Sequence, residues 1–197
     1  MFDQKSVPLS GISKVHAVLD TAKTVVIPKG RLHKYAVPYT KQLLSEPLLL
    51  RAAAIPLFIE DAPHVAGITA AHQLIESGFQ EQDWLHNLPL LTLSTSRFAI
   101  VTRYNNVSSL QRKIANGVAI TLCTEYPLTS RQIVRQAGIK AVIKSVDLGS
   151  SEARAQYVMA YDGALVITET GKTLFENNLA IAVDRLRDIE LRLIWTD

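Results

Sequence analysis

Apolar residues along the chain gather in short bursts that alternate with stretches of helical spacing. The bursts predict buried strands at residues 24–28, 54–59, 118–123, 139–145 and 163–168, and strict alternation predicts a half-buried strand at 189–195. Helical spacing predicts helices at residues 12–19, 31–46, 65–77, 109–115, 129–137, 149–160 and 171–177. Alternating strands and helices favour an α/β fold with mostly parallel sheets.

The long extended run at 89–103 falls between two strand–helix series. It fits either two strands or one strand that crosses between domains. We therefore expect two α/β domains. The second is placed at residues 95–165, inserted into a first domain made of residues 1–94 and 166–197.

Composition narrows the class of protein. The chain has 197 residues, of which 48% are apolar and 20% charged, as in ordinary soluble globular proteins. It has no apolar run of membrane-spanning length and no basic-then-apolar leader, so we expect a cytoplasmic protein without membrane contact. The single cysteine, Cys123, excludes an internal disulfide and a cysteine-cluster metal site, and the histidines show no metal-ligand spacing. We expect no metal site made of protein side chains.

The charge balance is weakly positive. A formal net charge of +3 suits an anionic small ligand and does not require nucleic acid. No run of basic residues is interleaved with aromatic residues, so nucleic acid is not expected as a partner.

The first candidate site is the turn Lys29-Gly30-Arg31, which follows the apolar strand 24–28 and precedes a predicted helix. Such turns present backbone amides and positive charge to anions in α/β proteins. Lysine supplies a point charge, arginine a two-pronged fork, and glycine lets a ligand approach closely. An ordinary strand-to-helix turn with solvated charges is an equally good interpretation.

The second candidate site is Thr170-Gly171-Lys172-Thr173, again between a strand and a helix. Glycine frees amides to curl around an anion, and threonine hydroxyls add donors, so the stretch is suited to holding a phosphate. It is not a Walker A loop, because Val166 occupies the place of the upstream glycine. The alternative is a helix start capped by threonine.

Two further polar stretches follow predicted strands, namely Thr124-Glu125-Tyr126-Pro127 and Gly149-Ser150-Ser151-Glu152. Alone, the first is an ordinary proline turn and the second a capping box at a helix start.

The order of these motifs is more informative than any one of them. It resembles the catalytic chain of ATP phosphoribosyltransferase in its short form, the first enzyme of histidine biosynthesis. The likeness runs from about Thr24 to Ile194. The residues that carry it are Pro28-Lys29-Gly30-Arg31-Leu32, Asp61-Ala62-Pro63, Gly67-Ile68-Thr69, Arg97, Thr124-Glu125-Tyr126-Pro127, Gly149-Ser150-Ser151-Glu152, Thr170-Gly171-Lys172-Thr173-Leu174 and Asn178-Leu179.

The resemblance implies a two-lobed fold like a type II periplasmic binding protein, with the active site in a cleft between two domains. It implies a glycosyltransferase that moves phosphoribosyl from phosphoribosyl diphosphate (PRPP) to N1 of ATP with Mg²⁺. Such a reaction has an oxocarbenium-like transition state and expels diphosphate, so it needs clamps for anions and a metal more than a nucleophile.

The resemblance also implies roles for individual residues. Lys29 and Arg31 near the diphosphate and Glu152 on the far wall of the cleft are the expected catalytic residues. The expected substrate-binding residues are Gly30, Thr124, Tyr126, Asp162, Glu169, Thr170, Gly171, Lys172 and Thr173, of which the last four hold the 5-phosphate of PRPP. The family has a ribose-binding aspartate where this chain has Val166, and a lysine where it has Glu125.

By the same resemblance the expected partners are ATP, PRPP, a second copy of the chain and a regulatory chain like histidyl-tRNA synthetase. Val166 and Glu125 motivate an alternative, a catalytically weakened relative that binds a nucleotide or phosphometabolite as a regulatory subunit. A solute-binding protein is a third interpretation, weakened by the absence of an export signal.

Overall fold

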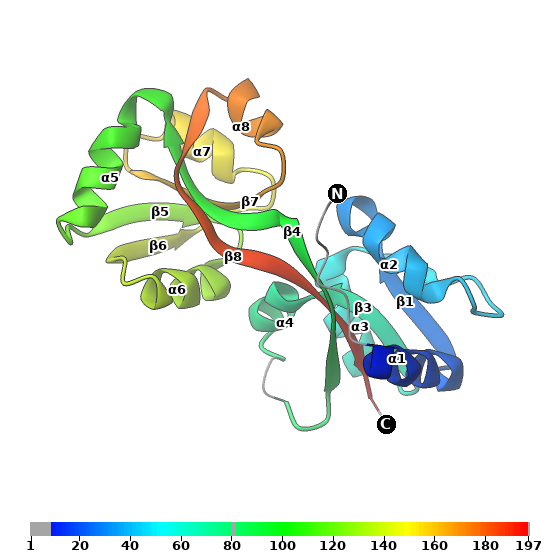
Figure 1. Ribbon diagram of the computed structural model, residues 1–197. Coiled ribbons are helices and arrows are strands. Elements are labelled where there is room, and N and C mark those ends of the chain that lie inside the picture. Colours follow the sequence, from blue (N-terminus) through cyan, green and yellow to red (C-terminus); the bar gives the residue numbers. More distant parts are fainter. Residues whose placement is uncertain (1–8, 80–81, 197) are drawn as a thin grey trace. The chain divides into compact units, whose positions relative to one another are not determined.

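Two long strands, β4 (His86–Arg103) and β8 (Leu179–Trp195), carry the chain between two separately packed units. The computed structural model describes residues 9–79 and 82–196. Unit 1 extends to Leu93 and resumes at Glu190, and unit 2 is the continuous segment Ser94–Ile189. Residues 166–189 therefore lie in unit 2, and the chain returns to unit 1 at Glu190 instead of at residue 166. Figure 1 shows both strands running through the two units.

Unit 1 is built on parallel strands with helices between them. Its elements are α1 (Leu9–Thr21), β1 (Thr24–Pro28), η1 (Gly30–Leu32), α2 (His33–Thr40), β2 (Leu48–Leu50), η2 (Ala52–Ala54), α3 (Ile55–Asp61), β3 (Val65–Ala70) and α4 (Ala71–Ser77), followed by the first part of β4 and the last part of β8. Strand β1 pairs in parallel with β2 and β3, and β8 pairs antiparallel with β3.

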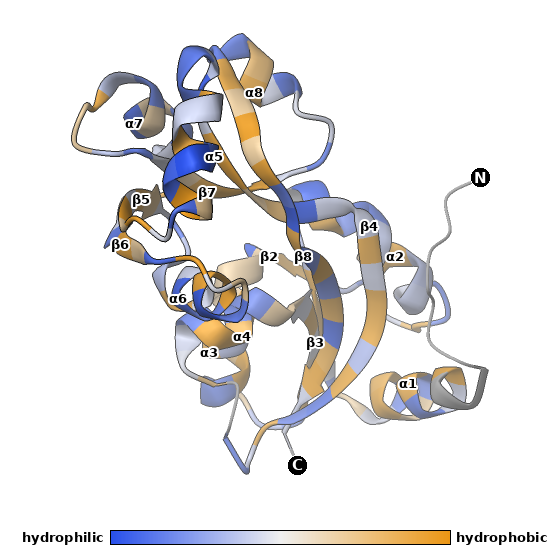
Figure 2. Ribbon diagram, turned by 60° about the vertical axis from the view of Figure 1, so that its left-hand side comes forward, coloured by the Kyte–Doolittle hydropathy of each residue, from blue (hydrophilic) through white to orange (hydrophobic). Residues whose placement is uncertain are grey.

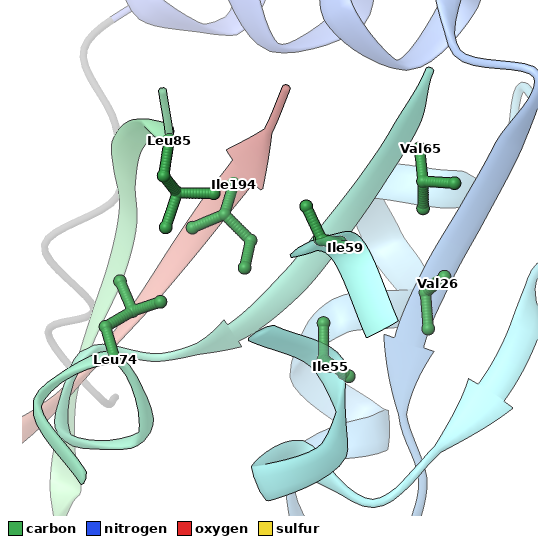
Figure 3. Packing of buried hydrophobic residues seen from close by; sticks show 7 residues of the cluster. All are labelled: Val26, Ile55, Ile59, Val65, Leu74, Leu85 and Ile194. Carbon is green, nitrogen blue, oxygen red and sulfur yellow. The ribbon is translucent and has the colours of Figure 1, made fainter. Parts of the chain in front are cut away.

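The core of unit 1 is an apolar cluster between α3 and the strands. Figure 3 shows its members, Val26, Ile55, Ile59, Val65, Leu74, Leu85 and Ile194. Ile55 and Ile59 lie one turn apart on α3 and so face the same way. Gly67 on β3 lies directly beneath them, and a Cβ there would stand 2.7 Å from a carbon of each isoleucine. The missing side chain at Gly67 therefore lets α3 pack closely on β3.

Unit 2 repeats the α/β plan. Its elements are the second part of β4, η3 (Tyr104–Asn106), α5 (Val107–Ala115), β5 (Ile120–Thr124), α6 (Pro127–Gln136), β6 (Ala141–Ser145), α7 (Ser151–Tyr157), β7 (Gly163–Thr168), α8 (Lys172–Glu176) and the first part of β8. Strand β5 pairs in parallel with β6 and β7, and β4 pairs antiparallel with β7. Taken over the strands of both units, the strand order is β2-β1-β3-β8-β4-β7-β5-β6. Parallel pairs predominate, as predicted.

The long strands differ from the short ones in their residue pattern. Figure 2 shows hydrophilic and hydrophobic residues alternating along β8, whereas β3 is buried at every position. A strand buried on both faces has no reason to alternate. Two of the sequence predictions are wrong for this reason. Without alternation, a short apolar segment can be taken for either a strand or a helix.

The predicted strand at 54–59 is helix α3, and the predicted helix at 65–77 is strand β3 followed by α4. Pro56 lies in the first turn of α3, where its missing N–H has no helical partner to lose. Leu57 is exposed while Ile55 and Ile59 are buried, which is helical and not strand periodicity. Short apolar runs do not distinguish the two kinds of element.

Other elements have the type that the sequence predicts, although some of their bounds differ from the predicted ones. The predicted helix at 31–46 is the shorter α2, which contains Pro38 and ends at Thr40. The run at 89–103 is one continuous strand, β4, and the strand at 163–168 is confirmed residue for residue as β7. Over the described parts of the chain, no helix is both long and apolar enough to span a membrane.

Candidate functional site

The segment Glu169–Thr173, called the 169–173 loop below, follows the carboxyl end of β7 and includes the first two residues of α8. Gly171 has a φ of 74°, in the left-handed region that favours glycine. Thr170, Lys172 and Thr173 are exposed. Within residues 9–79 and 82–196, the amides of Thr170, Gly171 and Thr173 find no protein acceptor, while the Lys172 amide donates to Thr170 Oγ1 at 3.4 Å. The loop thus offers amides, two hydroxyls and an ammonium to an anion.

The ammonium of Lys172 is only loosely engaged. Its Nζ lies 3.8 Å from Glu176 Oε1, and the two side chains are 81% and 58% exposed. Exposed pairs of this kind contribute little to stability and separate readily. Lys172 can therefore turn toward a ligand at small cost.

The base of the 169–173 loop is tied to strand β4. The Ser96 hydroxyl donates to Glu169 Oε1 at 2.5 Å, and Arg97 NH1 donates to the Glu169 carbonyl oxygen at 3.0 Å. Arg97 also forms a two-pronged ion pair with Asp184 on β8, at 2.7 Å and 3.1 Å. Hydrogen bonding within this pair raises the pKa of Arg97 and lowers the pKa of Asp184. Both groups therefore stay charged.

Thr124 ends strand β5 and is fully buried. Its hydroxyl donates to the Leu165 carbonyl at 2.8 Å and accepts from the Tyr126 amide and the Ser130 hydroxyl, each at 3.1 Å. These bonds join β5, β7 and the start of α6. The hydroxyl of Thr124 is fully used inside the protein, whereas the half-buried ring of Tyr126 packs edge-on against Phe98 at 5.8 Å.

The stretch Gly149–Glu152 leads into α7. The carboxylate of Glu125 accepts a hydrogen bond from the Gly149 amide at 2.7 Å, which links this stretch to the end of β5. Ser150 occupies the cap position without a side-chain capping bond, so the capping box considered from sequence is not formed. Glu152 is half-buried in the first turn of α7 and accepts no hydrogen bond from the part of the chain that the structure describes.

Parallel pairing gathers these motifs. Strands β5, β6 and β7 run in the same direction, so their carboxyl ends lie at one edge of unit 2. Thr124 ends β5 and Tyr126 follows it, Glu152 follows β6 through a short connection, and the 169–173 loop follows β7. This edge is the candidate site of unit 2.

Asp162 lies away from this edge. It precedes Gly163, the first residue of β7, and is therefore separated from the 169–173 loop by the whole strand, roughly 20 Å at the usual rise per residue. Its carboxylate accepts hydrogen bonds from Lys113 Nζ at 2.6 Å and from the Thr121 amide at 2.8 Å. Burial acts to raise the pKa of Asp162, but these bonds outweigh burial and lower the pKa below its usual value.

We expect Asp162→Asn to lower the free energy of unfolding by about 1–2 kcal/mol near neutral pH, because a charge-assisted bond is lost. A carboxylate with a lowered folded-state pKa stabilises the fold above its unfolded pKa and loses this contribution as the pH falls through the folded value. The difference between variant and wild type should therefore vanish in acid, as measured by urea unfolding at several pH values. Asp147→Asn is the matched control, because Asp147 is 94% exposed and lies 3.7 Å from Arg154. An equal loss in the control would contradict the assignment.

Val166 occupies the centre of β7 and is 4% exposed. It packs in the apolar cluster of unit 2, which comprises Val101, Cys123, Ala155, Ala164, Val166, Leu174 and Leu179. Burial raises the pKa of the Cys123 thiol to about 11, so this cysteine stays protonated. The position at which the resemblance implies a ribose-binding aspartate is thus part of the hydrophobic core here.

Lys29, Gly30 and Arg31 belong to unit 1. They follow the carboxyl end of β1 and are all exposed. Gly30 has a φ of 78°, and the Lys29 amide donates to the Leu50 carbonyl at 2.7 Å, which fixes the turn against β2. Neither cationic side chain forms an ion pair with residues 9–79 or 82–196. Each cation is available to an anion from solution.

Sequence reasoning gave no role to Ser96 and Asp184. Ser96 is 1% exposed, but it lies in the polar run Ser94-Thr95-Ser96-Arg97 of β4, so its sequence surroundings give no signal that it is buried. Asp184 lies beside Arg185, which has a φ of 49°, in the part of β8 that precedes the strand predicted at 189–195. Throughout the described ranges, no three His, Cys, Asp or Glu side chains gather as a metal site.

The sequence and the fold are similar to those of several known proteins. The family model described as "HisG: ATP phosphoribosyltransferase" matches residues 51–197. The ATP phosphoribosyltransferase of Methanopyrus kandleri is 28% identical over 193 residues, 87% of this chain and 64% of the relative. That of Halorubrum lacusprofundi is 30% identical over 153 residues, 74% of this chain and 50% of the relative. That of Staphylococcus saprophyticus is 27% identical over 192 residues, 87% of this chain and 85% of the relative.

Among solved structures, the ATP phosphoribosyl transferase (HisG:HisZ) complex from Thermotoga maritima matches with a TM-score of 0.62 at 22% identity, over 88% of this chain and 87% of that chain. A TctC solute binding protein from Polaromonas matches with a TM-score of 0.54 at 12% identity, over 88% and 77% of the two chains. These likenesses confirm an α/β fold of the type II periplasmic-binding-protein kind. The chain spans about two thirds of the Methanopyrus relative and half of the Halorubrum one.

Proposed function

We propose that this chain, which belongs to the ATP phosphoribosyltransferase family, transfers the phosphoribosyl group of PRPP to N1 of ATP. This reaction is the first step of histidine biosynthesis. The family model covers most of the chain, including every motif except the Lys29-Gly30-Arg31 turn. The single observation that carries the proposal is the open geometry of the 169–173 loop. The amides of Thr170, Gly171 and Thr173 find no acceptor within residues 9–79 and 82–196, and the Lys172 ammonium is held only loosely by Glu176.

The 169–173 loop is the proposed holder of the 5-phosphate of PRPP. Gly171 in the left-handed conformation allows consecutive amides to turn toward one oxygen cluster, as in backbone anion nests. Thr170 and Thr173 add hydroxyl donors, and Lys172 adds a charge that is weakly held by Glu176. Phosphate oxygens accept such bonds strongly because the acceptor is ionised.

Lys29 and Arg31 are the proposed contacts of the diphosphate leaving group. A departing diphosphate gains negative charge as the bond to ribose breaks, so cations beside it favour the transition state over the bound substrate. Both side chains are exposed, and Gly30 leaves space between them. Mg²⁺ is proposed to enter as part of the substrate, bound to the diphosphate, since Mg²⁺ usually keeps its waters and binds substrate phosphates.

Glu152 is proposed as the remaining catalytic residue and Tyr126 as a substrate contact, because both lie at the same edge of unit 2 as the 169–173 loop. Glu169 is proposed to hold the 169–173 loop in place, because its carboxylate accepts a hydrogen bond from Ser96. Thr124 is proposed to stabilise this edge, because its buried hydroxyl donates to the Leu165 carbonyl and so joins β5 to β7. ATP and PRPP are intracellular metabolites, so the proposed reaction places the chain in the cytoplasm.

The proposed assembly is a homodimer that associates with a regulatory chain like histidyl-tRNA synthetase. The Thermotoga maritima protein of similar fold is a complex of HisG with HisZ. Light scattering after size exclusion, with and without a co-expressed regulatory chain, tests this assembly separately from the chemistry.

The decisive experiment is to incubate the purified chain with ATP, PRPP and Mg²⁺, alone and with the regulatory chain, and to follow formation of phosphoribosyl-ATP. Thermal shift with PRPP measures binding in parallel, because a ligand of the folded state raises its stability. We expect both product and a shift. A chain that neither turns over nor binds PRPP in either form would overturn the proposal, and binding without turnover would indicate a regulatory role.

A further inference from the structure

We infer that Arg97 positions the 169–173 loop by fixing the orientation of the peptide between Glu169 and Thr170. Arg97 lies on β4, so its effect on a ligand of the loop is transmitted through the backbone of Glu169. The inference about the loop's conformation stands on contacts within unit 2, and its consequence for PRPP rests on the proposed function.

The contacts of Arg97 use all three nitrogens of its guanidinium. Nε and NH2 donate to the two carboxylate oxygens of Asp184 at 2.7 Å and 3.1 Å. NH1 donates to the carbonyl oxygens of Thr95 at 3.3 Å and Glu169 at 3.0 Å. The side chain of Arg97 is 15% exposed, so water competes little for these bonds. Because Asp184 binds two nitrogens of the planar guanidinium, the third nitrogen, NH1, points in one direction only.

This direction decides where the next amide points. In a trans peptide the carbonyl and the following N–H point to opposite sides of the chain, and the structure has no cis peptide bond among the residues it describes. When the Glu169 carbonyl is held toward Arg97, the Thr170 N–H is therefore directed away from Arg97. That N–H is one of the amides left without an acceptor in residues 9–79 and 82–196. A flipped peptide would withdraw it and present a carbonyl oxygen to an anion instead.

The surroundings of Arg97 reinforce this arrangement. Asp184 Oδ1 also accepts a hydrogen bond from the Arg185 amide at 2.8 Å, so the carboxylate is fixed to the bend of β8. Ser96 holds the side chain of Glu169 at 2.5 Å, which restrains the same residue from a second side. Lysine at position 97 could pair with Asp184 but could not also reach the Glu169 carbonyl in the same plane.

The test compares Arg97→Lys with wild type in two measurements. Hydrogen–deuterium exchange without ligand reports the loop through its bonded amides, such as that of Lys172, which donates to Thr170 Oγ1, because an amide that loses its bond exchanges faster. Binding of PRPP and the KM values for PRPP and ATP report the consequence. Arg187→Lys is the matched control, since Arg187 is another arginine of unit 2 whose NH2 bonds to Gln136 at 2.6 Å.

We expect Arg97→Lys to raise exchange in segment 168–174 while the rest of unit 2 is unchanged. PRPP affinity should fall about tenfold, as for loss of a hydrogen bond to a charged group, with the KM for ATP changed less than twofold. Arg187→Lys should change neither. Unchanged exchange in segment 168–174, or an equal rise of both KM values, would overturn the inference. Raised exchange in a chain whose wild type does not bind PRPP would confirm the positioning role and reject the proposed function.

Discussion

Gly171→Val is expected to weaken PRPP binding by at least about tenfold, because the loop loses two or more hydrogen bonds to an ionised phosphate. Gly171 has a φ of 74°, a conformation that costs a β-branched residue heavily. The backbone should relax to another conformation, and the amides of residues 170–173 would no longer converge. Calorimetric titration with PRPP measures the effect.

Gly138→Val is the matched control for this variant. Gly138 also lies in unit 2 with a φ of 67°, and a Cβ at either glycine would meet nothing within 4 Å. The cost to folding should therefore be similar in both variants, while only Gly171 lies in the 169–173 loop. If Gly138→Val weakened PRPP binding as much as Gly171→Val, the loop would not be the phosphate site.

Val166→Asp is expected to destabilise unit 2 by about 3 kcal/mol or more, because it buries a carboxylate without a partner. Val166 is 4% exposed and packs among apolar residues. A buried carboxyl group has a raised folded-state pKa, so the loss should be smallest in acid and grow as the pH rises above the unfolded pKa. Urea unfolding followed by circular dichroism measures the loss.

Two comparisons sharpen this test. Val142→Asp is the control, because Val142 is 48% exposed on β6 of the same unit and should tolerate the charge. Trp84 and Trp195, the two tryptophans of the chain, both lie in unit 1, so tryptophan fluorescence follows that unit. A Val166→Asp variant as stable as wild type at every pH would show that this position is not part of the core.

The α/β class and most strands of unit 2 could be predicted because their signals are local. Gly163–Thr168 is an apolar run between turns, and it forms β7 with those bounds. Unit 1 was harder, since Ile55–Asp61 and Val65–Ala70 are both short and apolar. The close packing of α3 over Gly67 is a contact between segments, and it leaves no local pattern in the sequence.

The candidate site shows the same limit. The motif order indicates the family, which the family model confirms, and it places Gly171 and Lys172 between strand β7 and the body of helix α8. It could not show that Asp162 lies at the far end of β7, bonded to Lys113, because adjacency in sequence hides the length of an extended strand. Asp184 was missed because its importance depends on Arg97, which is distant in sequence.

The chain leaves unit 1 along β4 and returns to it along β8, and this connectivity affects the order in which the two units can fold during synthesis. Unit 2 is one uninterrupted segment, so all of it has emerged from the ribosome once Ile189 has been added and has cleared the exit tunnel. Unit 1 still lacks the strand residues Leu191–Trp195, which pair with Ala66–Ala70 in the middle of its sheet. Chains generally fold domain by domain from the N-terminus. Here the N-terminal unit cannot complete its sheet until the whole of unit 2 has been synthesised, because Leu191–Trp195 follow unit 2 in the chain.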